Sequence, residues 1–230
     1  MLASTGAKIT MAALGTAAAV TAGTVGVTAL TSDDTPRARP AQSTPAGQRI
    51  DFGAFSLTAP AGATWRVQPI QPFPNRPADS FRVDVPGRCT GDNSKIPREE
   101  FRYRQTTYCP SFLVLGPTLV DPENGPGGVR LPGPYHPAGD ITHVCPPAAE
   151  RYNTGTWEGR PKAQLVAWGN RRAEYREWRM RCTDLRGSQV VNTNLTFTQR
   201  LWFLPQSRIA IVDEWNVPDL PRIIAQAVWG

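Results

Sequence analysis

The chain has few of the residues on which enzymes most often depend for proton transfer and nucleophilic attack. Its 230 residues include two histidines, His136 and His143, and four cysteines, none of which precedes Cys89. The Gly-x-Ser-x-Gly pentapeptide that marks the nucleophile of many hydrolases is absent. The cysteines and histidines also lack the short paired spacings of zinc sites, although His136, His143, Cys109 and Cys145 would form a Cys2His2 set. The sequence therefore predicts no metal site and no cofactor.

One catalytic alternative stays open. His143 can serve as a general base beside Asp140, with His136 as a weaker candidate, in a secreted hydrolase. A glycosidase is not supported by Asp213 and Glu214, because adjacent residues on a strand point to opposite faces. Asp213 falls on the apolar side of its strand and needs a partner there, for which Arg200 or Arg208 is available.

Charge is missing from the start of the chain. Ile9 to Ser32 contains no charged residue, and the 22 residues from Ile9 to Leu30 form a weakly apolar run long enough to cross a bilayer. Lys8 precedes the run and two aspartates follow it, which orients the N-terminus inside. Residues 1–30 are therefore either a membrane anchor or a signal peptide cleaved near Ala29. Both alternatives place the rest of the chain outside the cell membrane or in the medium.

Large aliphatic residues are missing from residues 31–49, which hold three prolines among small and polar residues. Such a segment buries too little to order itself, so we expect a disordered linker. Residues 50–230 then form a single extracytoplasmic domain. Lysine is also scarce, since 22 of the 25 cations are arginines, as a GC-rich genome produces. The net charge of +6 is therefore weak evidence for nucleic-acid binding, and no nucleic-acid partner is predicted.

The four cysteines of an exported chain are expected to form two disulfides. Three pairings are possible. We favour Cys89–Cys109 and Cys145–Cys182, because each joins a loop-rich stretch to an ordered segment nearby.

The alternation of apolar residues predicts an α+β fold. Strands expected near 163–168, 171–182, 195–204 and 209–215 form a C-terminal antiparallel meander with one apolar face. Asp219 is expected to cap an amphipathic helix that begins at Leu220 and covers the sheet. Ile50 to Leu57 reads as one strand with a bulge at Gly53. Residues 116–150, rich in proline and glycine, are expected to form a long surface excursion.

Interleaved basic and aromatic residues suggest a binding surface in the stretch from Arg171 to Arg186. The candidates there are Tyr175, Arg176 and Trp178; the alternative is a strand face whose charges pair with one another. Trp202, with Arg200 on the polar face of its strand, is a candidate exposed aromatic unless a second layer buries it.

The stretch Phe52-Gly-Ala-Phe-Ser-Leu-Thr-Ala-Pro-Ala-Gly-Ala-Thr-Trp65, and the strand-to-helix close after Ile209, resemble the Mog1/PsbP-like α/β/α sandwich domains. Such domains occur in exported, mostly uncharacterised proteins of high-GC Gram-positive bacteria. The resemblance implies a binding or scaffolding module without catalytic activity, and it carries over no functional residue. We therefore expect an envelope-associated binding domain, either on the membrane through its N-terminal helix or secreted, whose partner is a cell-wall polymer or another envelope protein.

Overall fold

The computed structural model describes residues 47–70, 77–93, 107–120, 134–136 and 143–230. The chain divides into two units, Met1–Gln42 and Ser43–Gly230, and every described residue belongs to the second. The predicted leader 1–30, most of the predicted linker 31–49 and Asp140 lie outside the described residues. None of the helices in the described ranges is long and apolar enough to cross a membrane.

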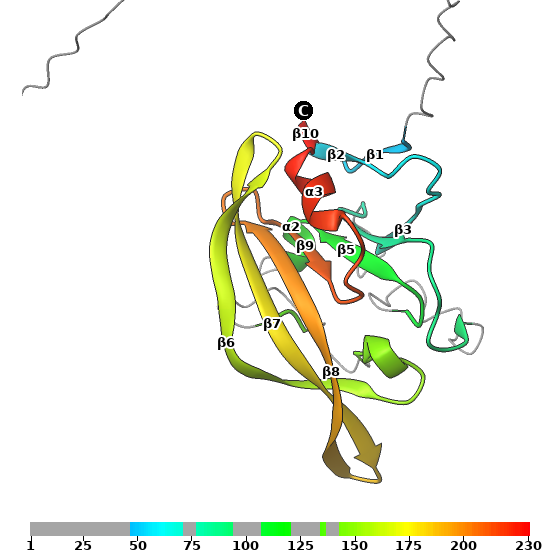
Figure 1. Cartoon of the computed structure of the whole chain (residues 1–230). Coiled ribbons are helices and arrows are strands. Elements are labelled where there is room, and N and C mark those ends of the chain that lie inside the picture. Colours follow the sequence, from blue (N-terminus) through cyan, green and yellow to red (C-terminus); the bar gives the residue numbers. More distant parts are fainter. Residues whose placement is uncertain (1–46, 71–76, 94–106, 121–133, 137–142) are drawn as a thin grey trace, which may run out of the picture. The chain divides into compact units, whose positions relative to one another are not determined.

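Two antiparallel sheets make up most of the described domain (Figure 1). The larger sheet has the strand order β3-β4-β5-β9-β8-β7-β6. Its strands are β3 (Arg66–Ile70), β4 (Ser80–Asp84), β5 (Ser111–Leu115), β6 (Asn153–Trp168), β7 (Arg171–Arg186), β8 (Gln189–Leu204) and β9 (Ile209–Asp213). The smaller sheet joins the two ends of the domain in the order β1-β2-β10, with strands β1 (Arg49–Asp51), β2 (Phe55–Thr58) and β10 (Val228–Trp229).

The predicted α+β class, with a sheet covered by helices, is wrong, although the antiparallel C-terminal meander is confirmed as β6-β7-β8-β9. The described helical segments are three short turns: α2 (Pro117–Val120), the 3-10 turn η2 (Pro146–Ala148) and α3 (Leu220–Ala225). Only α3 corresponds to a predicted helix, and it has six residues. The domain is therefore mainly β, and other segments cover the sheet.

The central strands β5 and β9 of the large sheet are buried on both faces, rather than on one. On the helix face, named here for its contact with α3, alternate residues of β5 and β9 join the core formed with β1, β2 and β10. The intervening residues of the same strands join a second core on the opposite face, here called the loop face. Phe112 and Leu113 show the pattern: the first lies in the helix-face core and the second in the loop-face core. Uninterrupted apolar runs such as 112–115 and 209–212 suit strands that are covered on both sides.

The described parts of the predicted surface excursion 116–150 cover the loop face. Leu119, Val120, Tyr135 and Cys145 are all buried in the core on that face. Both predicted disulfides are confirmed: Cys145 pairs with Cys182 on β7, and Cys89 pairs with Cys109. A segment predicted as a surface loop therefore supplies a core layer, which its cysteine fastens to the sheet.

The predicted glycine bulge near Gly53 is a hairpin turn. Ile50 of β1 pairs with Leu57 of β2 in antiparallel register, and Gly53 turns the chain with φ +82°. In this left-handed region glycine is favoured because it has no Cβ.

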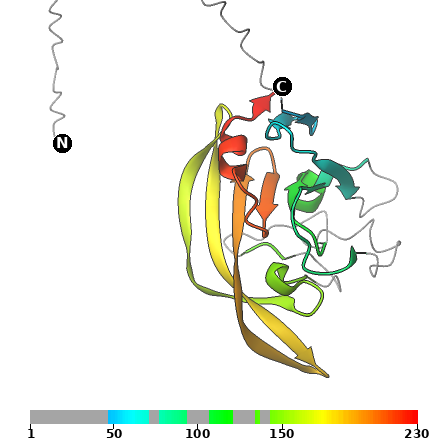
Figure 2. The same ribbon diagram turned by 45° about the vertical axis from the view of Figure 1, so that its right-hand side comes forward.

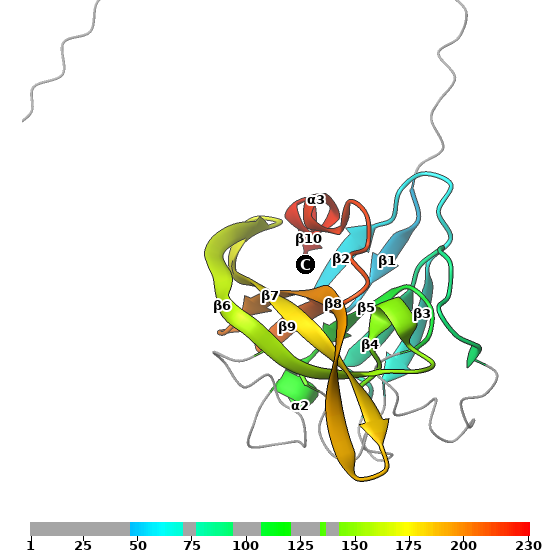
Figure 3. The same cartoon turned by 60° about the horizontal axis from the view of Figure 1, so that its bottom comes forward.

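Gly169, at the predicted hairpin turn between β6 and β7, is fixed against the C-terminal segment. It has φ +57°, its N–H donates to the Ile224 carbonyl at 3.1 Å, and a Cβ there would collide with the Ala227 carbonyl oxygen. Trp229 Nε1 donates to the Trp168 carbonyl beside it at 2.9 Å. The long strands are curved (Figure 2), and the end of β6 near this turn curls toward α3 (Figure 3). The curl leaves a groove between the sheet and α3.

Candidate functional site

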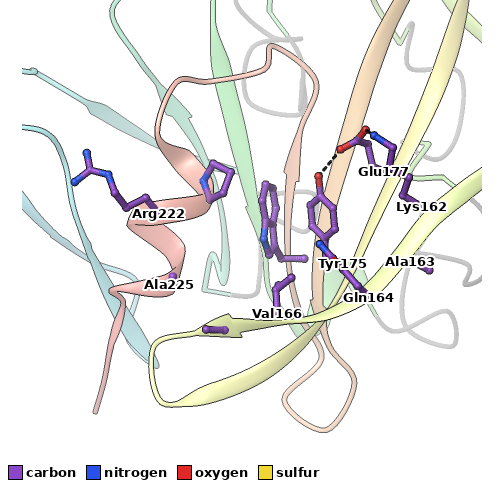
Figure 4. Close-up of a pocket in the computed structure, with 11 residues that line it drawn as sticks. Lys162, Ala163, Gln164, Val166, Tyr175, Glu177, Arg222 and Ala225 are labelled. Atoms are coloured by element: carbon purple, nitrogen blue, oxygen red, sulfur yellow. Dashed lines mark hydrogen bonds and ion pairs between the residues drawn. The ribbon is translucent and has the colours of Figure 1, made fainter.

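The groove lies between β6, β7, β8 and α3 and has a volume of about 600 Å³ (Figure 4). We call it the α3 groove. Its walls include Gln164 and Val166 of β6, Tyr175 and Glu177 of β7, and Arg222 of α3. Lys162, Ala163, Ala167, Trp202, Pro221 and Ala225 complete the lining. A pocket of this size with a mixed apolar and polar lining is typical of sites for small organic ligands.

Two of the predicted binding residues, Tyr175 and Trp202, pack together in this groove. They are cross-strand partners on β7 and β8, and their ring centroids lie 5.1 Å apart at an interplanar angle of 55°. Trp202 is 2% exposed, so the second layer buries it, and the alternative of an exposed aromatic does not hold. The smaller sheet and α3 form that layer.

The polar side of the groove is a connected set of three side chains. The Tyr175 hydroxyl donates to Glu177 Oε2 at 2.7 Å, and Lys162 Nζ donates to Glu177 Oε1 at 2.8 Å (Figure 4). The hydrogen bond from Lys162, followed by the one from Tyr175, lowers the pKa of Glu177 below its usual value. Burial, and then the hydrogen bond to Glu177, raises the pKa of Tyr175. The groove therefore holds a carboxylate and a neutral phenol at physiological pH.

Arg200, another predicted binding residue, is committed to a structural ion pair. Its Nε donates to Asp213 Oδ2 at 2.8 Å, and Nη2 bonds both Asp213 and the Val217 carbonyl. Asp213 is fully buried, and its carboxylate also accepts the backbone N–H groups of Trp215 and Val217. Burial raises the pKa of Asp213, and Arg200 opposes that shift. The predicted pairing of Asp213 with Arg200 is thus confirmed.

Arg176 and Trp178, the remaining predicted binding residues, do not join Tyr175 in the groove. Trp178 is 2% exposed and lies in the loop-face core. Arg176 pairs with Glu174 at 3.2 Å. Successive residues of a strand point to opposite faces, so β7 divides the predicted set between its two sides.

The six arginines between Arg171 and Arg186 all have partners within the domain. They bond Ser207, the Leu165 carbonyl, Glu174, Glu158 or Asp184, and Arg171 also lies 3.9 Å over the Trp229 ring. Four of the six pair with carboxylates, as in the alternative of a self-paired strand face, while Arg171 and Arg172 bond neutral groups.

His143, the predicted catalytic base, belongs to a buried polar cluster on the loop face. Its Nε2 lies 2.6 Å from Glu214 Oε1, and the Gln199 amide donates to the same oxygen, also at 2.6 Å. Gln199 in turn bonds the Tyr135 backbone through both amide atoms, at 2.7 and 3.0 Å. His143, Glu214 and Gln199 are 7%, 5% and 0% exposed. Neither Gln199 nor Tyr135 was expected at this site; Gln199 reaches it from a strand distant in the sequence.

His136 lies near this cluster, with its ring centroid 5.6 Å from that of His143. His143 Nδ1 and the Tyr135 hydroxyl are buried and have no hydrogen-bond partner among the described residues. Within those residues no group of three or more His, Cys, Asp or Glu side chains could hold a metal ion. All four cysteines are in disulfides, which leaves no thiol to act as a nucleophile or a ligand.

A second pocket, of about 450 Å³, lies next to this cluster, and Glu214 contributes to its lining. We call it the cystine pocket because four of its lining residues are adjacent in sequence to disulfide cysteines. Arg88 and Thr90 flank Cys89, Pro110 follows Cys109, and Pro146 follows Cys145. Pro147, Phe197, Thr198, Trp215 and Asn216 form the rest of the lining. Both disulfides therefore fix the walls of one pocket.

Comparison of the chain with protein-family models, with curated proteins and with solved structures found no match. The proposal below therefore rests on the α3 groove, the cystine pocket and the chemistry of their side chains.

Proposed function

We propose that this protein is an extracytoplasmic, envelope-associated binding domain without catalytic activity, and that the α3 groove binds a sugar unit of a cell-wall polymer. The observation that carries the proposal is the Tyr175–Trp202 aromatic pair beside the Glu177 carboxylate in one groove. The leader, the linker and the resemblance to exported domains remain expectations from the sequence.

The disulfides support the extracytoplasmic part of the proposal. Stable disulfides form in oxidising compartments and are rare in the cytosol. The Cys145–Cys182 bond is built into the loop-face core, where both residues are fully buried. A structural disulfide in this position requires an oxidising compartment during folding, which suits an exported chain.

The mixed lining of the groove supports a sugar as the ligand. A hexose presents C–H groups on the faces of its ring and hydroxyls around its edge. The Tyr175 ring, Val166 and Pro221 offer apolar contact, while the Glu177 carboxylate and the Gln164 amide can bond hydroxyls. Hydrogen bonds to a charged group are stronger than those between neutral groups, so Glu177 should contribute most to affinity.

The rigidity of the groove also favours binding. Gly169 and Trp229 tie the β6–β7 turn to the C-terminal segment, and the Lys162–Glu177–Tyr175 hydrogen bonds hold the carboxylate in place. A preformed site loses less conformational entropy when a ligand binds.

Co-sedimentation with insoluble wall polysaccharide from the source cells tests this proposal. We expect the wild-type protein to sediment with the polymer, and Tyr175→Ala and Glu177→Gln to weaken binding about tenfold or more. Arg179→Gln is the matched control, since Arg179 lies on the same strand two residues beyond Glu177, outside the groove lining. Equal sedimentation of all variants, or none by the wild type, would overturn the proposal.

The same samples test the hydrolase alternative, which uses His143 and Asp140. The one observation in its favour is that Glu214 holds His143 through Nε2, as a carboxylate orients a catalytic histidine. Release of soluble fragments from the polymer that is lost in His143→Ala would support this alternative. We expect no release.

A further inference from the structure

The cystine pocket occupies a gap in the large sheet. β8 runs for 16 residues, but β9 pairs only with its last five, from Arg200 to Leu204. Beyond Asp213 the chain leaves the sheet, so within the described ranges the edge of β8 at Phe197 and Thr198 faces the pocket instead of a strand. The pocket is therefore part of the fold's architecture rather than a surface irregularity.

Glu214 places a carboxylate in this pocket. Its side chain is 4% exposed; His143 Nε2 lies 2.6 Å from Oε1 and 2.8 Å from Oε2, and the Gln199 amide donates to Oε1 at 2.6 Å. A cation within hydrogen-bond distance stabilises the charged form of a buried carboxylate. Oε1 has two of these contacts and Oε2 has one, so Oε2 can accept one further hydrogen bond, because each carboxylate oxygen has about two acceptor positions.

The walls of the pocket suit a cation on an apolar stem. Phe197 and Trp215 contribute aromatic rings, and Pro110, Pro146 and Pro147 contribute apolar C–H surface. Aromatic faces attract ammonium groups through the ring quadrupole, most strongly where water is excluded. The disulfides hold the prolines in place, so the pocket is preformed.

We propose that the cystine pocket is a second binding site, for a primary ammonium group carried on an aliphatic stem, with the Glu214 carboxylate as its acceptor. One N–H of the ammonium donates to the remaining acceptor position of Glu214 Oε2, and the stem lies against Trp215 and the prolines. Arg88 is exposed at the edge of the pocket, and its positive charge repels a cationic ligand. Removal of this charge should therefore strengthen binding.

NMR titration of the ¹⁵N-labelled full-length chain with butylammonium tests this proposal. We expect saturable shifts of the Trp215 indole N–H and the Thr198 amide. Butanol, which has a similar shape but no charge, should bind about tenfold or more weakly, and butyrate should not bind. Glu214→Gln should weaken butylammonium binding by a similar factor, and Arg88→Gln should strengthen it about twofold to threefold.

Two variants protect the test against simple misfolding. If Glu214→Gln unfolds the protein, Trp215→Leu and Arg88→Gln still test the proposal. Trp215 is partly exposed and Arg88 is exposed, so these substitutions should leave the fold intact. The first should weaken the binding of butylammonium and the second should strengthen it. Failure to saturate, equal binding of butanol, or butyrate binding that depends on Arg88 would overturn the proposal.

Discussion

Arg200 and Asp213 are cross-strand partners on β8 and β9 and form a buried ion pair on the helix face of the sheet. Gln199 precedes Arg200, and Glu214 follows Asp213. The Gln199 amide donates to Glu214 Oε1 at 2.6 Å on the opposite face of the sheet. Two consecutive residues on each strand thus build two polar clusters on two faces. The Arg200–Asp213 pair supports the α3 groove, and the Gln199–Glu214 pair borders the cystine pocket.

Removal of Arg200 is expected to destabilise the protein in a pH-dependent way. Arg200→Met leaves the Asp213 carboxylate buried without its cation, which should cost about 3–5 kcal/mol at pH 7. The pKa of Asp213 is raised by burial and lowered by Arg200, so the variant should raise it further. The folded variant then binds a proton that the unfolded chain does not, and its deficit in unfolding free energy shrinks as the pH falls from 7 to 5. Urea unfolding at both pH values measures this; an equal deficit would count against the account.

The two disulfides are expected to differ in accessibility. Cys145 and Cys182 are fully buried, whereas Cys89 is exposed and Cys109 is partly exposed. Mild thiol treatment of the folded protein should therefore reduce Cys89–Cys109 first, raising the intact mass by two hydrogens. The bonds span 20 and 37 residues, so their loss should lower stability by about 3 and about 4 kcal/mol in the chain-entropy model. Mass spectrometry after alkylation distinguishes this order from simultaneous reduction, which would contradict it.

Glu177 should titrate at unusually low pH. Its pKa is lowered mainly by Lys162 and then by Tyr175, so the carboxylate contributes stability above its unfolded-state pKa and loses it as the pH falls through the lower, folded value. Lys162→Met should move the pKa back toward the usual value, and Tyr175→Phe should move it by less. NMR titration of the Glu177 carboxyl carbon measures both shifts. A pKa that does not respond to Lys162→Met would show that the hydrogen bond seen here contributes little in solution.

The meander could be predicted from the sequence because alternation along a strand is a local signal. The strand 209–215 was expected within a few residues of its observed bounds. The predicted strand 163–168 has the observed end at Trp168, followed by the predicted turn at Gly169 and Asn170, but β6 begins much earlier, at Asn153. Alternation does not reveal what covers a face. Trp202 stands between the apolar residues Leu201 and Phe203, so alternation placed it on the polar face of its strand. The smaller sheet, made from the two ends of the domain, covers that face and buries Trp202.

The surroundings of Tyr135 and Glu214 were missed for the same reason, since both depend on partners distant in the sequence, whereas the error at Asp219 is local. The segment 116–150 looked like a surface loop by composition, yet Tyr135 is fully buried because Gln199, 64 residues away, bonds its backbone. Glu214 was recognised as pointing away from Asp213, but its partner His143 is 71 residues away and no local pattern joins them. Asp219 was expected to cap α3; it has φ +58° and no capping hydrogen bond, and it pairs instead with Arg222.

Mapping the site of wall-sugar binding by NMR tests the central claim most directly. The ¹⁵N-labelled protein is titrated with soluble oligosaccharides released from the wall polymer of the source cells. The account predicts saturable shifts at Gln164, Tyr175 and Glu177, which line the α3 groove, and none at Trp178 on the opposite face of β7. Shifts confined to the loop face, or no saturable shift at any concentration, would contradict the assignment of the α3 groove as the binding site.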